Sequence, residues 1–313
     1  MPTAVIAIGG NSLIKDKDHQ SVEDQYLAAG ETDQHIAHLV AAGWDVAISH
    51  GNGPQVGFIM RRSELARDEL HEIPMDVAGA DTQGAIGYAL QQNLVNDFRG
   101  MGIDKSVATI VTQVEVSADD PAMINPSKPI GTFLEEAEAK QRQEDEGWVV
   151  MEDAGRGWRR VVASPQPKRI VEIDVIRQLM DAGVVVICVG GGGIPVVADE
   201  KGDLYGVAAV IDKDLASALL ASEINADLLI ISTAVEKVAL RFGTPEQEWV
   251  DSFTLAEVKQ YLDDGGHFAE GSMAPKMRAV VQFLEAGGKE ALITNPENLE
   301  RALAGETGTR IVP

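Results

Sequence analysis

The sequence has a single cysteine, few basic residues and no long apolar run, and each shortage excludes a class of protein. Cys188 has no partner for an intrachain disulfide. It lies in the apolar run Val184–Val189 and is interpreted as a small buried hydrophobe in a reducing, cytoplasmic setting. The 26 lysines and arginines face 49 aspartates and glutamates, a formal net charge of −23. This charge argues against a nucleic-acid partner, because binding a phosphate backbone needs a basic surface.

The sequence also has no pattern typical of membrane insertion or secretion. The longest uncharged stretch, Ala182–Ala198, contains four consecutive glycines and is shorter than the ~20 apolar residues that span a bilayer. The segment Met1–Asn11 has no basic region and no long apolar region, so we expect no secretory signal and no membrane partner. The 313 residues, 45% of them hydrophobic, instead predict a globular protein of one large or two modest domains.

Short β-branched runs alternate with amphipathic stretches, which is the pattern of an α/β protein with a largely parallel sheet. The expected strands are Ala4–Ile8, Asp45–Ser49, Val107–Thr112, Val184–Val189, Leu228–Ser232 and Ala291–Thr294. Apolar residues at helical spacing predict helices over Val22–Ala42, Gln55–Leu70, Ala78–Phe98, Ile170–Ala182, Leu215–Ile224, Leu255–Asp263 and Lys276–Ala286.

The segment Val116–Gln166 interrupts this alternation. It contains four prolines, a charged run, and two short strand-like stretches, Trp148–Met151 and Gly157–Val162, around Gly155. Such an excursion from a sheet predicts a lid or a small subdomain. The alternative is a solvated surface insertion without a function.

Three glycine-rich turns directly follow expected strands: Gly9-Gly10-Asn11, His50-Gly51-Asn52-Gly53-Pro54 and Gly190–Gly193. Ligands bind at the carboxyl ends of parallel strands, and glycine lets backbone N–H groups approach an anion closely. The three turns together predict one convergent anion site. Helices that start after Pro54 and near Asp212 would add their positive N-terminal ends to it.

Other familiar sites do not fit the sequence. There is no P-loop, and Ile194-Pro195 after the four glycines breaks the dinucleotide-binding spacing. His35 and His38 are three residues apart on a polar helical face, with no carboxylate or cysteine cluster to complete a metal site, so we expect no protein-bound metal. Ser49 and His50 lack the setting of a hydrolase nucleophile.

Three lysines are unusually placed for so acidic a chain. Lys128, Lys213 and Lys276 are each flanked by proline, glycine or aspartate, at a turn or a helix start. Phosphoryl transfer needs positive charge around the oxygens of the transferred group, and these lysines together with Mg²⁺ would supply it without a P-loop. The ordinary alternative for each lysine is a solvated surface charge.

Eight blocks of the chain, taken in order, form a specific set. They are Gly9-Gly10-Asn11, His50-Gly51-Asn52-Gly53-Pro54-Gln55-Val56-Gly57, Thr82-Gln83-Gly84, Lys128-Pro129-Ile130-Gly131, Glu152-Asp153-Ala154-Gly155-Arg156-Gly157-Trp158-Arg159, Gly190-Gly191-Gly192-Gly193-Ile194-Pro195-Val196, Asp212-Lys213-Asp214 and Gly271-Ser272-Met273-Ala274-Pro275-Lys276. Over essentially the whole chain, this set resembles the carbamate kinases of the amino acid kinase superfamily.

Some positions bear on the details of this resemblance. Other superfamily members usually carry a lysine two residues before the first glycine pair, where this chain has Ala7; carbamate kinases use the lysine of the Asp-Lys-Asp block, here Lys213. Thr132 stands where a proline is common after Pro-Ile-Gly, and Ile231–Val235 varies the strand end on the nucleotide side. The second departure concerns nucleotide preference and leaves the reaction unaffected.

The resemblance implies a three-layer αβα sandwich around a mainly parallel open sheet, with a small protruding lid subdomain at about 116–166. Residues 1–215 would bind carbamate and carbamoyl phosphate, and residues 216–313 would bind ATP or ADP. The implied reaction is reversible phosphoryl transfer between ATP, carried with Mg²⁺, and carbamate, run toward ATP synthesis in arginine or agmatine catabolism. Family members are homodimers, so a homodimer is expected.

The resemblance also assigns roles to residues around the expected anion site. We expect backbone N–H groups of Gly51, Asn52 and Gly53 to hold carbamate, and Gly9, Gly10 and Asn11 to contact the transferred phosphoryl group. On the nucleotide side we expect Gly191, Gly192, Thr233, Val238, Met273 and Lys276.

The charged residues receive distinct roles in this hypothesis. Lys213 and Lys276 would stabilise the transition state, and Asp214 would orient both lysines. Lys128 would close over the substrate from the lid, while Asp212 is interpreted as a helix cap. Carbamate is itself an anion, so its attacking oxygen needs no general base, and positioning and charge neutralisation carry the reaction.

Two alternatives to a carbamate kinase can be weighed from individual residues. Another superfamily kinase would act on an acyl or nucleotide phosphate acceptor, and Ala7 disfavours that assignment. A non-catalytic nucleotide-binding sensor on the same fold should have lost Lys128, Lys213, Lys276 or Asp214, and all four are present.

Overall fold

The computed structural model describes residues 1–14, 16, 18–152 and 157–313. The α-helices within them are α1 (Val22–Ala41), α2 (Gly53–Ala66), α3 (Met75–Met101), α4 (Pro121–Ile124), α5 (Glu136–Glu146), α6 (Ile173–Asp181), α7 (Lys213–Glu223), α8 (Leu255–Asp264), α9 (Met273–Glu285) and α10 (Leu299–Leu303). Short 3₁₀ helices are η1 (Gly10–Ser12), η2 (Gly190–Gly192) and η3 (Pro296–Asn298).

The strands are β1 (Thr3–Ile8), β2 (Asp45–His50), β3 (Val107–Thr109), β4 (Gln113–Val116), β5 (Lys128–Leu134), β6 (Val149–Glu152), β7 (Trp158–Val162), β8 (Pro167–Ile170), β9 (Val185–Ile187), β10 (Ile194–Ala198), β11 (Leu204–Gly206), β12 (Leu228–Ser232), β13 (Val238–Leu240), β14 (Glu248–Val250), β15 (Ser252–Thr254), β16 (Glu290–Thr294) and β17 (Thr309–Val312).

An eight-stranded sheet in the order β15-β17-β16-β12-β1-β2-β9-β3 forms the centre of the molecule. β1 pairs in parallel with β12 on one side and with β2 on the other, so that Ala4 lies opposite both Leu228 and Val46. β17 runs antiparallel to β16 and parallel to the edge strand β15. The six strands from β16 to β3 are therefore parallel, and the turns that follow them meet at one edge of the sheet.

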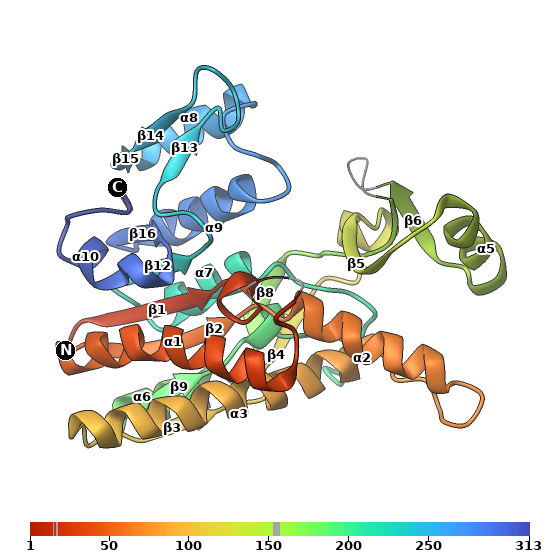
Figure 1. Ribbon diagram of the computed structural model, residues 1–313, viewed down its shortest axis with the longest axis horizontal. Helices are drawn as coiled ribbons and strands as arrows, with labels where there is room; N and C mark the ends of the chain where they lie inside the picture. Colours follow the sequence, from red (N-terminus) through yellow and green to blue (C-terminus); the bar gives the residue numbers. More distant parts are fainter. Residues whose placement is uncertain (15, 17, 153–156) are drawn as a thin grey trace.

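Both faces of this sheet are covered, as Figure 1 shows for α1 and α3 on one face and α7 and α9 near the other. Alternate residues of β1 divide between two cores: Ile6 belongs to the cluster that includes Ile36 of α1 and Leu90 of α3. Val5 belongs to the cluster that includes Leu220 of α7 and Val280 of α9. This arrangement confirms the predicted α/β fold with three layers around a mainly parallel sheet.

The six predicted strands all lie in this sheet, with different ends. β3 stops at Thr109, earlier than predicted, because Thr112 leaves the strand and makes its backbone hydrogen bonds with the side chain of Gln83. The helix expected from Ile170 begins at Ile173, since Pro167–Ile170 form β8 and pair with β4. Among the elements that the sequence pattern did not predict are α5 and the β13–β14 hairpin.

A subdomain projects from the rest of the molecule, at the right of Figure 1. The chain leaves through β4 and returns through β8, which are antiparallel neighbours in a second sheet. Between them, β5, β7 and β6 form their own three-stranded sheet beside α5. The segment 153–156, which contains the predicted turn at Gly155, lies outside the described residues.

The expected lobe boundary at residue 215 falls inside helix α7, and the central sheet runs through both expected lobes. In the described part of the chain, no helix combines the length and the apolar character needed to cross a bilayer.

Candidate active site

The turns after β1 and β2 meet beside the first residue of α7. Gly51 donates its N–H to the carbonyl of Ile8 at 2.9 Å. A methyl group placed on Gly51 would lie 3.5 Å from the backbone nitrogen of Gly10 and 3.5 Å from Cδ of Lys213. The two glycine turns and the Lys213 side chain therefore share one small region at the carboxyl edge of the sheet.

Helix α2 begins at Gly53, immediately after the second turn, with Pro54 in its first turn. Asn52 precedes the helix but makes no side-chain hydrogen bond to its N-terminus. Backbone N–H groups at this end are thus left for a ligand, and the helix dipole adds positive potential there. This arrangement suits an anion, as expected for Gly51–Gly53.

Asp214 holds two lysine ammonium groups at the same place. Nζ of Lys213 donates to Oδ1 of Asp214 at 2.5 Å, and Nζ of Lys276 donates to Oδ2 at 2.8 Å. Lys213 and Asp214 belong to the first turn of α7, whereas Lys276 comes from the first turn of α9. Both hydrogen bonds that the orienting role of Asp214 requires are present.

Burial makes these charges interdependent. Burial alone would raise the pKa of Asp214, but the ammonium groups of Lys213 and Lys276 outweigh it and hold the pKa of this carboxyl well below its usual range. Burial lowers the pKa of Lys213, and Asp214 opposes that effect while the charge of Lys276 adds to it. Asp214, with a smaller contribution from Asp212, thus favours the charged form of Lys213.

Lys128 reaches the same region from the subdomain. It is the first residue of β5, and its Nζ donates to Oδ2 of Asp212 at 2.8 Å. The other oxygen of Asp212 accepts from the backbone N–H groups of Asp214 at 3.0 Å and Leu215 at 3.4 Å. The predicted capping role of Asp212 is confirmed, and the ion pair with Lys128 is an addition that the sequence did not predict.

Thr82 and Gln83 of α3 are buried and form hydrogen bonds with residues of two of the glycine turns. Asn52 donates from Nδ2 to Oγ1 of Thr82 at 2.8 Å. Gln83 accepts from the N–H of Thr112 at 2.7 Å and donates to the carbonyl of Gly190 at 2.9 Å. The Thr82-Gln83-Gly84 block was part of the sequence resemblance, but no role for it was predicted.

The third glycine turn fits tightly against the second one. Gly191 and Gly192 are buried, with φ of +68° and +92°. A Cβ on Gly191 would lie 2.1 Å from Nδ2 of Asn52, and one on Gly192 would lie 2.5 Å from the carbonyl oxygen of Ile211. These glycines are needed for close packing beneath the site, and the nucleotide contact predicted for them stays a prediction.

His50 is buried between these turns and is held neutral. Its Nδ1 lies 3.0 Å from the carbonyl oxygen of Gly51, so this nitrogen carries the proton and donates it. Burial lowers the pKa of His50 to about 4; the hydrogen bond to Gly51 opposes this, and the charge of Lys213 adds to it. A neutral, fully enclosed imidazole supports the turn and is not placed to exchange protons with a substrate.

A mainly apolar pocket of about 220 Å³ lies next to Lys276. Residues from the end of β12, the β13–β14 hairpin and the start of α9 line it: Thr233, Ala234, Val235, Lys237, Ala239, Phe242, Trp249, Ala269, Ser272, Met273 and Lys276. Three of the residues predicted on the nucleotide side, Thr233, Met273 and Lys276, are among them. The aromatic pair Phe242 and Trp249, whose ring centroids are 6.3 Å apart, was missed by the sequence reading.

Val238 does not line this pocket. It is fully buried in the core, and its N–H donates to Oγ1 of Thr309 at 2.8 Å. Its neighbours Lys237 and Ala239 line the pocket instead. The side chain of Val238 therefore points into the core, and its predicted contact with the nucleotide stays a prediction.

Comparisons with known proteins agree with this geometry. A sequence profile described as the Amino acid kinase family matches residues 2–295. The carbamate kinase of Pyrococcus horikoshii is 48% identical over 312 residues, which cover 99% of this chain and 98% of the relative. The structure of the Giardia lamblia carbamate kinase bound to AMP-PNP is similar with a TM-score of 0.92 at 42% identity, covering 99% of this chain and 98% of that one.

The chain belongs to the carbamate kinases. It is also 50% identical over 311 residues, 98% of each chain, to the carbamate kinase-like protein YahI of Escherichia coli. The suspected resemblance is thereby confirmed. Ala7 is consistent with this membership, and the side chain of Lys213 lies next to Gly51 in the turn after β2.

Proposed function

We propose that this member of the carbamate kinase family transfers a phosphoryl group reversibly between ATP, carried with Mg²⁺, and carbamate. In the forward direction, a carbamate oxygen forms a bond to the γ-phosphorus as the bond to the bridging oxygen breaks, which gives carbamoyl phosphate and ADP. The observation that carries the proposal is the buried Asp214 holding Lys213 and Lys276 beside two glycine turns.

The groups near the site match what this chemistry needs. The carbamate oxygen is already negatively charged, so no base is required, and His50 is buried and neutral. Two lysine ammonium groups fixed on one carboxylate supply preorganised positive charge for the transferred phosphoryl group. Because Asp214 carries one negative charge for two positive ones, this cluster retains a net positive charge.

The geometry supports a placement for both substrates. The base and ribose of the nucleotide occupy the pocket between Thr233, Trp249 and Met273, which leads to Lys276. Carbamate binds at Gly51–Gly53, at the N-terminus of α2 where no described side chain caps the helix. The phosphoryl group passes between them, next to Gly9, Gly10 and Asn11, although the side chain of Asn11 is not among those described.

The oligomeric state and the cellular location proposed for this enzyme rest on its exposed apolar side chains and on its single cysteine. Large apolar side chains of α1 and α3, among them Val22, Leu27, Tyr88 and Val95, are exposed, and we propose that such a surface pairs two copies in a homodimer. The single, buried Cys188 suits a cytoplasmic enzyme. Use in arginine or agmatine catabolism, in the direction of ATP, is part of the proposal.

One experiment tests the reaction directly. The pure protein is mixed with carbamoyl phosphate, ADP and Mg²⁺, and ATP formation is measured; in separate reactions carbamate, acetylglutamate and UMP are offered with ATP, and ADP release is measured. ATP formation from carbamoyl phosphate together with ADP release on carbamate alone supports the proposal. ADP release on another acceptor favours a different kinase of the superfamily. Nucleotide binding without turnover favours a non-catalytic nucleotide-binding sensor.

A further inference from the structure

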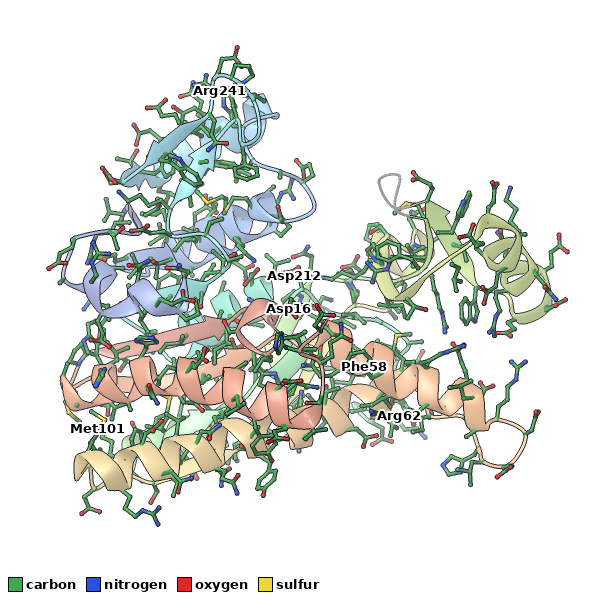
Figure 2. The ribbon with its side chains drawn as sticks, in the orientation of Figure 1. Asp16, Phe58, Arg62, Met101, Asp212 and Arg241 are labelled. Carbon is green, nitrogen blue, oxygen red and sulfur yellow. The ribbon has the colours of Figure 1, made fainter. Side chains whose placement is uncertain are left out.

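The carboxylate of Asp212 divides its two oxygens between two parts of the protein. Oδ1 accepts the N–H groups that cap α7, from Asp214 and Leu215. Oδ2 takes no part in the cap and accepts from Nζ of Lys128 at 2.8 Å. Lys128 is 84 residues away in the sequence and belongs to the projecting subdomain. Figure 2 labels Asp212 where the central part of the molecule faces that subdomain.

This pairing repeats what Asp214 does two residues later. Asp214 holds Lys213 of α7 and Lys276 of α9. Asp212 holds Lys128 of β5. The three lysines come from three separate elements, and two carboxylates at the start of α7 hold all of them: Asp214 holds two lysines and Asp212 holds the third.

The pairing leaves Lys128 able to bind a substrate. A lysine ammonium has three N–H donors, and the bond to Asp212 uses one of them. The side chain of Lys128 is 31% exposed and that of Asp212 is 20% exposed, so the pair is not fully enclosed by protein. A lysine without such a partner would spread over many rotamers and would have to be ordered when the substrate binds.

We propose that Asp212 is a positioning residue that places the ammonium group of Lys128 for the transferred phosphoryl group. This role is additional to capping α7. Its effect on turnover rests on the proposed function. It also fixes where the subdomain meets the core, because Lys128 begins the strand β5.

The test distinguishes the two roles of the Asp212 carboxylate, which are capping α7 and binding Lys128. Asparagine ranks with aspartate as an N-cap, so Asp212→Asn keeps the cap while it removes the charged partner of Lys128. We expect kcat/KM for carbamoyl phosphate in ATP formation to fall about 10- to 100-fold, with the KM for ADP within about twofold of wild type. In a Lys128→Met background, the same substitution should cause no further loss.

Asp45→Asn is the matched control. Asp45 pairs with Lys105 at 2.7 Å, with side chains 22% and 17% exposed, at the start of β2 and so at the opposite end of the strand from the site. This variant loses a comparable ion pair and should keep its turnover within twofold. Equal losses in Asp45→Asn and Asp212→Asn would overturn the proposal, as would an unchanged kcat/KM in Asp212→Asn or a full additional loss in the Lys128→Met background.

A second measurement does not depend on activity. Brief acetylation with a trace of acetic anhydride is followed by mass spectrometry, and the labelling of Lys128 is compared with that of the exposed Lys201. We expect Asp212→Asn to increase the relative labelling of Lys128 several-fold, because Nζ would no longer be held against the carboxylate and would be more accessible to the reagent. Unchanged labelling would overturn the pairing. If the wild-type protein forms no ATP while the labelling changes as expected, the proposed reaction fails and the pairing stands.

Discussion

Replacing Asp214 with asparagine tests the centre of the proposed mechanism. Asp214 is 3% exposed and accepts from two lysine ammonium groups at 2.5 and 2.8 Å. Removing one partner of a buried ion pair costs about 3–5 kcal/mol, because the remaining charge stays buried without compensation. A protein in the upper part of the ordinary range of about 5–15 kcal/mol remains folded after such a loss. Circular dichroism of the variant checks that it is folded before it is assayed.

The effect on catalysis follows from the lysines. The amide oxygen of an asparagine carries no charge and cannot neutralise two ammonium groups, so we expect kcat to fall about 10²- to 10³-fold. The pKa of Lys213 is already lowered by burial, and Asp214 opposes this most strongly, with a smaller contribution from Asp212. In Asp214→Asn the pKa of Lys213 falls further. Because only the charged lysine stabilises the phosphoryl oxygens, activity is lost as pH rises through that pKa.

The assay is ATP formation from carbamoyl phosphate and ADP, measured from pH 6 to pH 10 in wild type and Asp214→Asn. The decline of kcat at high pH should begin at a lower pH in the variant. Asp45→Asn, which breaks the remote ion pair with Lys105, should show the wild-type profile. A kcat within tenfold of wild type, together with an unshifted profile, would refute the reasoning about Asp214.

Three further predictions concern other parts of the molecule. Lys276→Ala should lower kcat at least ~100-fold while circular dichroism shows an unchanged fold; a value within tenfold of wild type contradicts its assignment. Replacing residues 121–164 with a short glycine linker should leave a folded protein that binds nucleotide, because Oδ2 of Asp120 accepts from the N–H of Gln166 at 2.9 Å and the cut ends lie close together; it should form no ATP, and retained turnover would count against a lid role. The pKa of His50 is about 4 in the folded protein, against 6.5 for a histidine in the unfolded chain. Between these two pH values the unfolded state binds more protons than the folded state, so the free energy of unfolding decreases as the pH falls from 6.5 to 4. Urea unfolding should show wild type losing about 3 kcal/mol more than His50→Asn between pH 7 and pH 4; equal losses would contradict the pKa of His50.

The parts of the fold that local patterns determine could be predicted. β1 and β12 are short, continuous apolar runs because they are covered on both faces, and the glycines that follow β1 and β2 indicated the ligand edge. Helix α5 was missed because its highly charged sequence has almost no apolar stripe, with only Ala139 buried.

The parts that depend on tertiary contacts were harder to predict. The resemblance assigns Val238 to the nucleotide side, but successive side chains of a strand point to opposite sides. Lys237 and Ala239 therefore reach the pocket and Val238 reaches the core. The bond between Lys128 and Asp212 joins segments 84 residues apart, and flanking residues alone could not reveal it.

The net charge of −23 has a kinetic consequence. Carbamate, carbamoyl phosphate and nucleotides are all anions, so the surface as a whole repels them at long range. The three site lysines attract them only within a screening length of about 8 Å at physiological ionic strength. Moderate salt therefore weakens the distant repulsion more than the close attraction, and the encounter rate of this enzyme with its substrates should rise on going from very low to physiological ionic strength. In most enzymes with charged substrates, steering by the surface gives the opposite dependence.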